Sequence, residues 1–227
     1  MLKFYFHPSP NPLKVALLLE ELGDPFELVA VDIFKGEQHA PDYLKINPNG
    51  KVPAIVMDDG LAVFDSNAIL LHLAEVHGRF LPTTDTPRAQ LLSWLFFIAT
   101  GFSPFSGQAV HFLNATPEPI PYARNRYLRE IERHYRVLNN RLADSQYLVG
   151  NEYTIADMAF WGWANFSPLI FGDAGLTDYP HVRRLYEEIS GRPAAAGAHA
   201  LKERLTLKAD FDDETRRALF PQNEPLA

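Results

Sequence analysis

The chain has 227 residues and no cysteine, and its 28 acidic residues outnumber its 21 basic ones to give a formal charge of −7. This balance argues against a nucleic-acid partner, because a phosphate backbone attracts an excess of positive charge. Without cysteine the chain has no thiol nucleophile, so any sulfur chemistry must use the sulfur of a bound ligand. The sequence begins directly with a strand pattern and has no apolar run near the roughly 20 residues of a membrane span. We therefore expect a soluble cytoplasmic protein with no membrane partner.

The first eighty residues alternate between strand and helix patterns. Asn11 is expected to cap the first helix with Pro12 at its first position, and the Gly-Asp-Pro run at 23–25 ends it. In chain order the sequence predicts a strand at 2–7, a helix at 13–22, a strand at 26–31 parallel to the first, a short helix near 41–44, a hairpin that turns at 58–60, and a helix at 66–77.

A linker is expected from Leu81 to Pro87, where two prolines and polar side chains separate two patterned regions. Strand patterns are absent after it, and helical patterns cover about 88–112 and 122–142. We expect the Gly101–Gly107 stretch to bend or break the first of these helices, because Pro104 lacks an N–H and clashes with the preceding turn. The predicted organisation is an α/β domain at 1–80, a linker at 81–87 and an all-helical domain at 88–227.

Two later helix starts carry capping residues. Thr154 and Asp157 match a capping box, in which each side chain bonds the backbone N–H of the other residue. Asp212 or Asp213 is expected to cap a short helix that ends before Pro221. We interpret these caps as structural.

Polar groups are expected at both ends of the predicted hairpin. Pro53 has no N–H, so a strand that begins at Ala54 loses nothing by it, while the backbone groups of Val52 stay free to pair with something else. At the other end Ser66 can cap a helix and offer donors to a carboxylate, and Asp65 can accept an ammonium. One site would then hold the two charged groups of an amino acid.

The run KVP at 51–53 followed by FDSNAI at 64–69 resembles the glutathione-binding half of the soluble glutathione transferases. This resemblance implies an α/β thioredoxin-like N-terminal domain, an all-α C-terminal helical domain, glutathione as co-substrate and a homodimer. It also implies that Val52, before a cis proline, pairs with the cysteinyl unit of glutathione, and that Asp65 and Ser66 hold the γ-glutamyl end. A plain helix cap is the alternative interpretation of the Asp-Ser pair.

Two residues where the first strand turns into the first helix are candidates to activate the glutathione sulfur. Ser9 and Asn11 would direct hydrogen-bond donors and the positive helix end toward a sulfur positioned by Val52. Lowering a thiol pKa from about 8.5 to about 6.5 requires roughly 2.7 kcal/mol, which one or two hydrogen bonds to a charged group supply. A turn residue and a plain N-cap are the alternatives. Tyr5 competes for the role, because other classes of the resembled family use a tyrosine at the end of this strand.

The Ser9-Pro10-Asn11 run, with Gly107-Gln108 and the Ile-Pro-Tyr-Ala run at 120–123, is most similar to the bacterial nu-class and Ure2-like groups. These are often glutathione-dependent disulfide reductases without a catalytic cysteine. The resemblance therefore implies a disulfide reductase that uses the thiolate of bound glutathione. A conjugating transferase or a peroxidase, acting on an electrophilic small molecule, is one alternative. A non-catalytic glutathione-binding module is the other.

Four further side chains are weaker candidates for binding glutathione. Gln38 lies in a loop whose counterpart in the resembled family reaches glutathione, and Lys51 would offset the glycyl carboxylate. Arg88 and Arg133 stand at nu-like positions and could meet carboxylates, although solvated helix faces also explain them. The eight histidines show no metal-ligand spacing, and we expect no metal and no cofactor beyond glutathione.

Overall fold

A four-stranded mixed sheet organises the first part of the chain in this computed structural model, which describes residues 1–223. The strands are β1 (Leu2–Phe6), β2 (Phe26–Ala30), β3 (Ala54–Val56) and β4 (Ala62–Phe64), in the order β2-β1-β3-β4. The β2 strand runs parallel to β1, and β3 runs antiparallel to both β1 and β4. The predicted strand-helix-strand unit and hairpin are confirmed.

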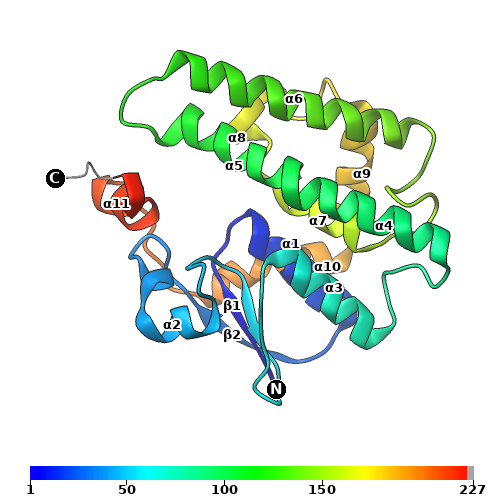
Figure 1. The fold of residues 1–227 in the computed structure, drawn as a ribbon, viewed down its shortest axis with the longest axis horizontal. Helices are drawn as coiled ribbons and strands as arrows, with labels where there is room; N and C mark the ends of the chain where they lie inside the picture. Colours follow the sequence, from blue (N-terminus) through cyan, green and yellow to red (C-terminus); the bar gives the residue numbers. More distant parts are fainter. Residues whose placement is uncertain (224–227) are drawn as a thin grey trace.

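Helices cover both faces of this sheet (Figure 1). On one face α1 (Pro10–Leu22) and α3 (Ser66–His77) pack over Phe4 and Phe6, which are fully buried. On the other face lies α2 (Pro41–Ile46), preceded by a 3₁₀ turn at Glu37–His39, and Tyr43 of α2 packs against Tyr5 with ring centroids 5.7 Å apart. This layout is the expected thioredoxin-like arrangement.

The first helix begins before its predicted cap, whereas the helix predicted at 66–77 has those bounds but a different capping residue. The first starts at Pro10 with Ser9 as its N-cap, so Asn11 lies inside the first turn. The third helix is capped by Asp65, whose Oδ1 accepts hydrogen bonds from the N–H groups of Asn67 at 2.9 Å and Ala68 at 3.2 Å. Ser66 is therefore the first helical residue, and its hydroxyl is not used as a cap.

The second part of the chain is helical. The expected linker ends early, at Thr84, because Asp85 to Pro87 form the first turn of α4. The α-helices are α4 (Asp85–Phe97), α5 (Ser103–Val110), α6 (Pro121–Ala143), α7 (Ile155–Ala164), α8 (Pro168–Phe171), α9 (Pro180–Ser190), α10 (Pro193–Ala200) and α11 (Asp213–Leu219). Short 3₁₀ turns lie at Gly172–Ala174, Leu201–Arg204 and Pro221–Asn223.

The helix expected to bend or break near Pro104 instead continues through a π-helical turn at Ile98–Phe102, directly before α5. A second π turn, His111–Ala115, follows α5. A π turn inserts one extra residue, which absorbs the backbone mismatch before the proline without ending the helix. Of the two predicted alternatives the break at Gly101–Gly107 is wrong, because the helical backbone continues through this stretch. A π turn is one of the usual causes of a bend within a helix.

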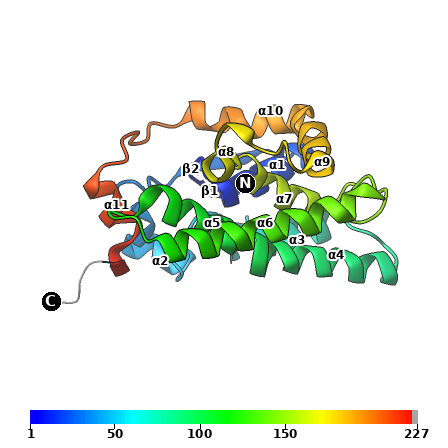
Figure 2. The same ribbon diagram turned by 90° about the horizontal axis from the view of Figure 1, so that it is seen from above.

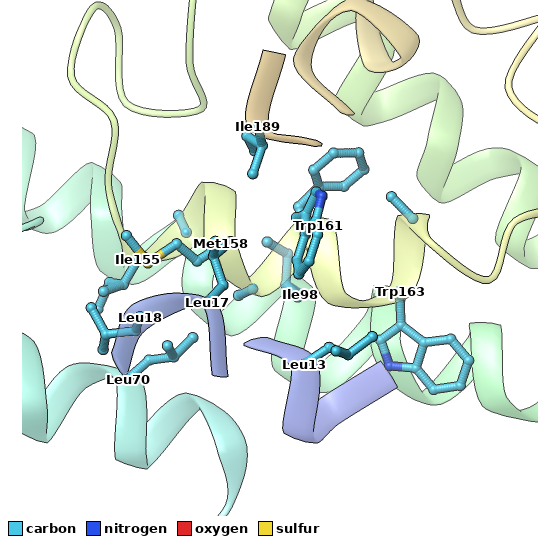
Figure 3. Packing of buried hydrophobic residues seen from close by; sticks show 14 of the residues in the cluster. Leu13, Leu17, Leu18, Leu70, Ile98, Ile155, Met158, Trp161, Trp163 and Ile189 are labelled. Carbon is cyan, nitrogen blue, oxygen red and sulfur yellow. The ribbon is translucent and has the colours of Figure 1, made fainter. Parts of the chain in front are cut away.

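The α7 helix is buried along its whole length and packs against α1 (Figure 3). Gly162 permits this close approach, because a Cβ added there would lie 2.5 Å from the backbone oxygen of Pro10. The capping box of Thr154 and Asp157 at the start of α7 is confirmed. One apolar core thus runs through the sheet with its helices, which we call the first layer, and through the helices from α4 to α10, which we call the helical layer. This core holds the first turn of α1 against the helical layer.

The C-terminal segment, residues 208–223, returns to the first layer after α10 (Figure 2). Asp212 caps α11 as expected, since its carboxylate accepts from the Thr215 N–H at 2.8 Å. The last four residues of the predicted second domain, 224–227, lie outside the described residues. Within residues 1–223, no helix has the length and apolarity needed to cross a membrane.

Candidate active site

Strand pairing brings three predicted site segments to one edge of the sheet. Tyr5 of β1 pairs with Ala54 of β3, and Ala54 pairs with Phe64 of β4. Because β3 runs opposite to its two neighbours, the residues after β1, before β3 and after β4 all emerge at the same edge. Three segments therefore meet at this edge of the sheet, which we call the converging edge: Ser9–Asn11, Val52–Pro53 and Asp65–Ser66.

A cis peptide bond joins Val52 to Pro53, as the resemblance implied. The preceding carbonyl, of Lys51, is fixed by hydrogen bonds from the Tyr43 hydroxyl at 2.7 Å and the Asn47 side-chain amide at 2.6 Å. Within residues 1–223 the backbone N–H and C=O of Val52 have no hydrogen-bond partner. Val52 thus presents a fixed, unpaired donor and acceptor, which can bind an extended peptide backbone.

The Asp65–Ser66 pair offers separate positions for an ammonium and a carboxylate. Asp65 is exposed and has a φ of 68°, a strained value for a residue with a side chain. Both of its capping bonds use Oδ1, which leaves Oδ2 for an ammonium. Ser66 is 4% exposed at the first position of α3, where free N–H groups and the helix dipole favour an anion.

Lys14 lies behind Ser66 and has no exposed surface. Its Nζ donates to Ser103 Oγ at 2.9 Å and lies 3.5 Å from Ser66 Oγ. Burial lowers the pKa of the Lys14 ammonium to about 7, while the Asp65 carboxylate acts in the opposite direction. No role was predicted for Lys14 from the sequence. A signal was present, since Lys14 is spaced three and four residues from Leu17 and Leu18 on the apolar face of α1.

Asn11 is oriented by a tryptophan of the helical layer. The indole Nε1 of Trp163 donates to Asn11 Oδ1 at 3.2 Å, and Figure 3 shows Trp163 at the end of α7 near Leu13 of α1. An indole N–H can only donate, so the contacted atom must be the amide oxygen and the Asn11 NH₂ group points elsewhere. Sequence reasoning missed Trp163, although a buried indole N–H requires a partner.

The other two candidate thiol donors are placed differently. The Ser9 hydroxyl donates to the His7 carbonyl at 3.3 Å, and the Ser9 N–H bonds the same oxygen at 2.7 Å. Tyr5 lies on the face of the sheet that α2 covers, where it packs against Tyr43. The structure therefore puts Ser9 and Asn11 at the converging edge and Tyr5 in a packed layer.

Gln38 is 2% exposed and is covered by the C-terminal segment. Its Nε2 donates to the Ala218 carbonyl at 3.0 Å, while its Oε1 is buried with no partner within residues 1–223. The same segment reaches the helical layer, because the guanidinium of Arg216 donates to the Ala115 carbonyl at 3.1 Å. The C-terminal segment thus joins the Gln38 loop to the second layer.

The remaining charged candidates are not brought together with these groups. Arg88 pairs with Glu75 in the last turn of α3, about 13 Å along that helix from Ser66. Arg133 is half-exposed on α6 and bonds Glu130 of the same helix at 2.6 Å. Lys51 precedes Val52 in the chain and has an exposed side chain. Within residues 1–223, no group of three or more His, Asp or Glu is arranged to hold a metal ion.

Two family models match the chain. Residues 8–76 match the glutathione S-transferase N-terminal domain, and residues 107–193 match the glutathione S-transferase C-terminal domain. The chain belongs to the glutathione S-transferase family, which agrees with its fold and with the residues at the converging edge.

Several known relatives cover most of the chain. The disulfide-bond oxidoreductase YfcG of Escherichia coli is 44% identical over 94% of this chain and 98% of its own length. The structure of the glutathione transferase URE2P6 from Phanerochaete chrysosporium, in complex with oxidized glutathione, superposes with a TM-score of 0.83 at 34% identity, covering 90% of this chain and 97% of that one. A glutathione transferase from Burkholderia graminis, with two glutathione molecules bound per subunit, has a TM-score of 0.83 at 33% identity, covering 90% and 89%.

Proposed function

We propose that this protein is a glutathione-dependent disulfide reductase of the nu-class or Ure2-like type. The observation that carries the proposal is the Asn11 amide, oriented by Trp163 at the start of α1, at the same edge of the sheet as the unpaired Val52 backbone, in a chain without cysteine. A cysteine-free site can reduce a disulfide by thiol–disulfide exchange only with the sulfur of its ligand. The name of the 44% identical relative, a disulfide-bond oxidoreductase, supports this choice over conjugation.

The residues divide the binding of glutathione between them. Val52, before cis-Pro53, pairs with the cysteinyl backbone, Asp65 accepts the γ-glutamyl ammonium, and Ser66 donates to the γ-glutamyl carboxylate. Gln38 and Lys51 border the glycyl end. Arg88 is already paired with Glu75, which favours a structural role, and Arg133 is held in the same way by Glu130.

The reaction follows thiol-disulfide exchange. Asn11 Nδ2 and Ser9 stabilise the thiolate of glutathione, which attacks one sulfur of the substrate disulfide. The other substrate sulfur leaves as a thiolate and takes up a proton, and a mixed disulfide with glutathione forms. A second glutathione thiolate then attacks the mixed disulfide. The products are two substrate thiols and oxidized glutathione, so two electrons pass from two glutathiones to one disulfide.

We also propose a cytoplasmic homodimer. The cytoplasm holds glutathione reduced, as this reaction requires. The β4 strand is an edge strand of the sheet, and its Phe64 is 41% exposed. Phe96 on α4 is 59% exposed, so exposed apolar side chains are available to contact a second subunit. A monomer in light scattering at micromolar concentration would contradict the dimer.

The test of function combines binding and turnover. The protein is applied to immobilised glutathione, and reduction of hydroxyethyl disulfide is then followed with glutathione reductase and NADPH, with conjugation to a chloronitrobenzene measured in parallel. We expect retention and disulfide reduction that exceeds conjugation. Retention without either turnover would identify a binding module, and conjugation alone would identify a conjugating transferase.

A further inference from the structure

Lys14 is a fully buried amine for which the reaction above needs no role. It connects three helices, since it projects from α1 toward Ser66 of α3 and Ser103 of α5. The fourth helix makes room for it, because a Cβ added to Gly162 of α7 would lie 2.4 Å from Lys14 Cγ. A buried ammonium whose hydrogen-bond partners are neutral hydroxyls lowers the stability of the fold, so this position requires an explanation.

The protonation state of Lys14 decides the direction of the Ser66 hydroxyl. An ammonium has three donors and no acceptor, so Ser66 Oγ can only accept from it, and the hydroxyl hydrogen must point away. A neutral amine has a lone pair, which lets Ser66 donate inward instead. Only the first arrangement leaves the Ser66 hydroxyl free to donate to a ligand carboxylate.

We propose that Lys14 is a positioning residue that, when protonated, directs the Ser66 hydroxyl to the γ-glutamyl carboxylate, so that glutathione binding is coupled to proton uptake by Lys14. This inference rests on the proposed function and assigns a pH-sensing residue to the same site.

The electrostatic surroundings support the coupling. Among the described residues, Asp65 is the charged side chain whose field acts on Lys14, while the neighbouring Ser66 and Ser103 are neutral and α7 presents a glycine. Burial lowers the pKa of Lys14 to about 7, so near neutral pH the free protein holds a mixture of both forms. A bound carboxylate favours the charged form and raises this pKa, and the complex therefore takes up a proton.

The experiment uses S-methylglutathione, which has no thiol proton to release. Titration calorimetry at pH 6 to 9, in two buffers of different ionisation enthalpy, gives the affinity and the protons taken up. The variants are Lys14→Met, which removes the charge at similar length, and Lys3→Met, an exposed lysine on β1, as control. We expect Lys14→Met to bind about tenfold more weakly at pH 6. By pH 9 the ratio of the dissociation constants of Lys14→Met and wild type should approach one, because the wild-type lysine is then neutral in both the free and the bound protein.

Proton uptake provides the second readout. At pH 7 to 8 the wild type and Lys3→Met should take up about half a proton more per site than Lys14→Met. A purely structural lysine would not produce this difference. Lys14→Met should also unfold at no lower temperature than the wild type, since removal of a buried charge is often neutral or stabilising.

A double-mutant cycle tests whether Lys14 acts through Ser66. In a Ser66→Ala background, Lys14→Met should change affinity less than about twofold. Equal affinity and equal proton uptake for wild type and Lys14→Met, or additive effects in the cycle, would overturn the inference and leave the proposed function standing. Absence of S-methylglutathione binding by the wild type would overturn both.

Discussion

Trp163 donates a hydrogen bond from its indole nitrogen to Oδ1 of Asn11, 3.2 Å away, across the boundary between the two layers. The contact fixes the amide oxygen of Asn11 against the indole, so the Asn11 NH₂ group is directed away from Trp163. A tryptophan of the helical domain thereby orients a donor of the glutathione-binding domain.

We predict that Trp163→Phe lowers disulfide reduction at neutral pH by about three- to tenfold, because the ring remains and only the donor is lost. The optimum of the rate should move to higher pH. Trp161→Phe is the matched control, since its indole donates to Ser190 on the far side of α7. The same shift in both variants would show a general packing effect.

Asn11→Ala and Ser9→Ala should each lower the rate by roughly ten- to a hundredfold, corresponding to about 1.4–2.7 kcal/mol of lost thiolate stabilisation. Asn11→Ala should have the larger effect, because the Ser9 hydroxyl also bonds the His7 carbonyl. Tyr5→Phe should change little. The thiolate absorbance of bound glutathione is titrated in all three, and a shift confined to Tyr5→Phe would reassign the protein to the tyrosine type.

Gly162→Ala should destabilise the protein by about 1–3 kcal/mol and reduce glutathione affinity. The added Cβ would meet the Pro10 carbonyl, which is backbone and cannot move aside freely. Gly107→Ala is the control, because its Cβ would lie 3.5 Å from the Trp163 ring, an ordinary contact. Urea unfolding should show that variant unchanged or stabilised by up to about 1 kcal/mol, from helix propensity.

Stability without ligand should rise with pH between 7 and 9. The pKa of Lys14 is lowered from its usual 10.5 to about 7, so over this interval the unfolded chain binds more protons than the folded one. The contribution of Lys14 to the free energy of unfolding rises by at most about 1.4 kcal/mol per pH unit. Urea midpoints at pH 7, 8 and 9 should show this slope in the wild type and lose it in Lys14→Met. Parallel slopes in the two proteins would contradict it.

Removal of the C-terminal segment from Lys208 onward should raise the Michaelis constant for glutathione. Gln38 would lose its bond to the Ala218 carbonyl, and Asp32 would lose its bond from the Lys208 N–H. A chain that ends at Asn223 keeps both contacts and serves as the control. Unchanged kinetics in the shorter chain would exclude a contribution of this segment to the site.

The sequence predicted what local patterns determine. Periodicity predicted the strands and most helices. The Pro53 and Asp65–Ser66 motifs identified two of the segments that meet at the converging edge. The start of the first helix was missed by a few residues, because Pro10 suits a first helical turn as well as Pro12 does. The helix predicted at 66–77 has those bounds, but Asp65 caps it in place of Ser66. The π turn before Pro104 was missed, since no local pattern distinguishes it from a break.

Contacts between distant segments could not be predicted in this way. Lys14 meets Ser103, Trp163 meets Asn11, and Gln38 meets Ala218, a partner 180 positions away. The first two depend on how the two layers pack, and the third depends on where the C-terminal segment lies on the first layer. A single sequence does not encode either arrangement at short range. The resemblance to the family supplied the expected ligand, and the packing supplied the residues that orient the groups around it.

The two chain ends offer unequal places for an affinity tag. The amino group of Met1 pairs with Asp58 in the hairpin turn, at the sheet edge opposite the converging segments. Toward the other end α11 lies beside the first layer (Figure 1), and the Ala218 carbonyl of this helix accepts a hydrogen bond from Gln38. We therefore expect a purification tag or fusion partner on the N-terminus to leave the converging edge clear, whereas one placed after α11 would be attached to the helix that contacts Gln38.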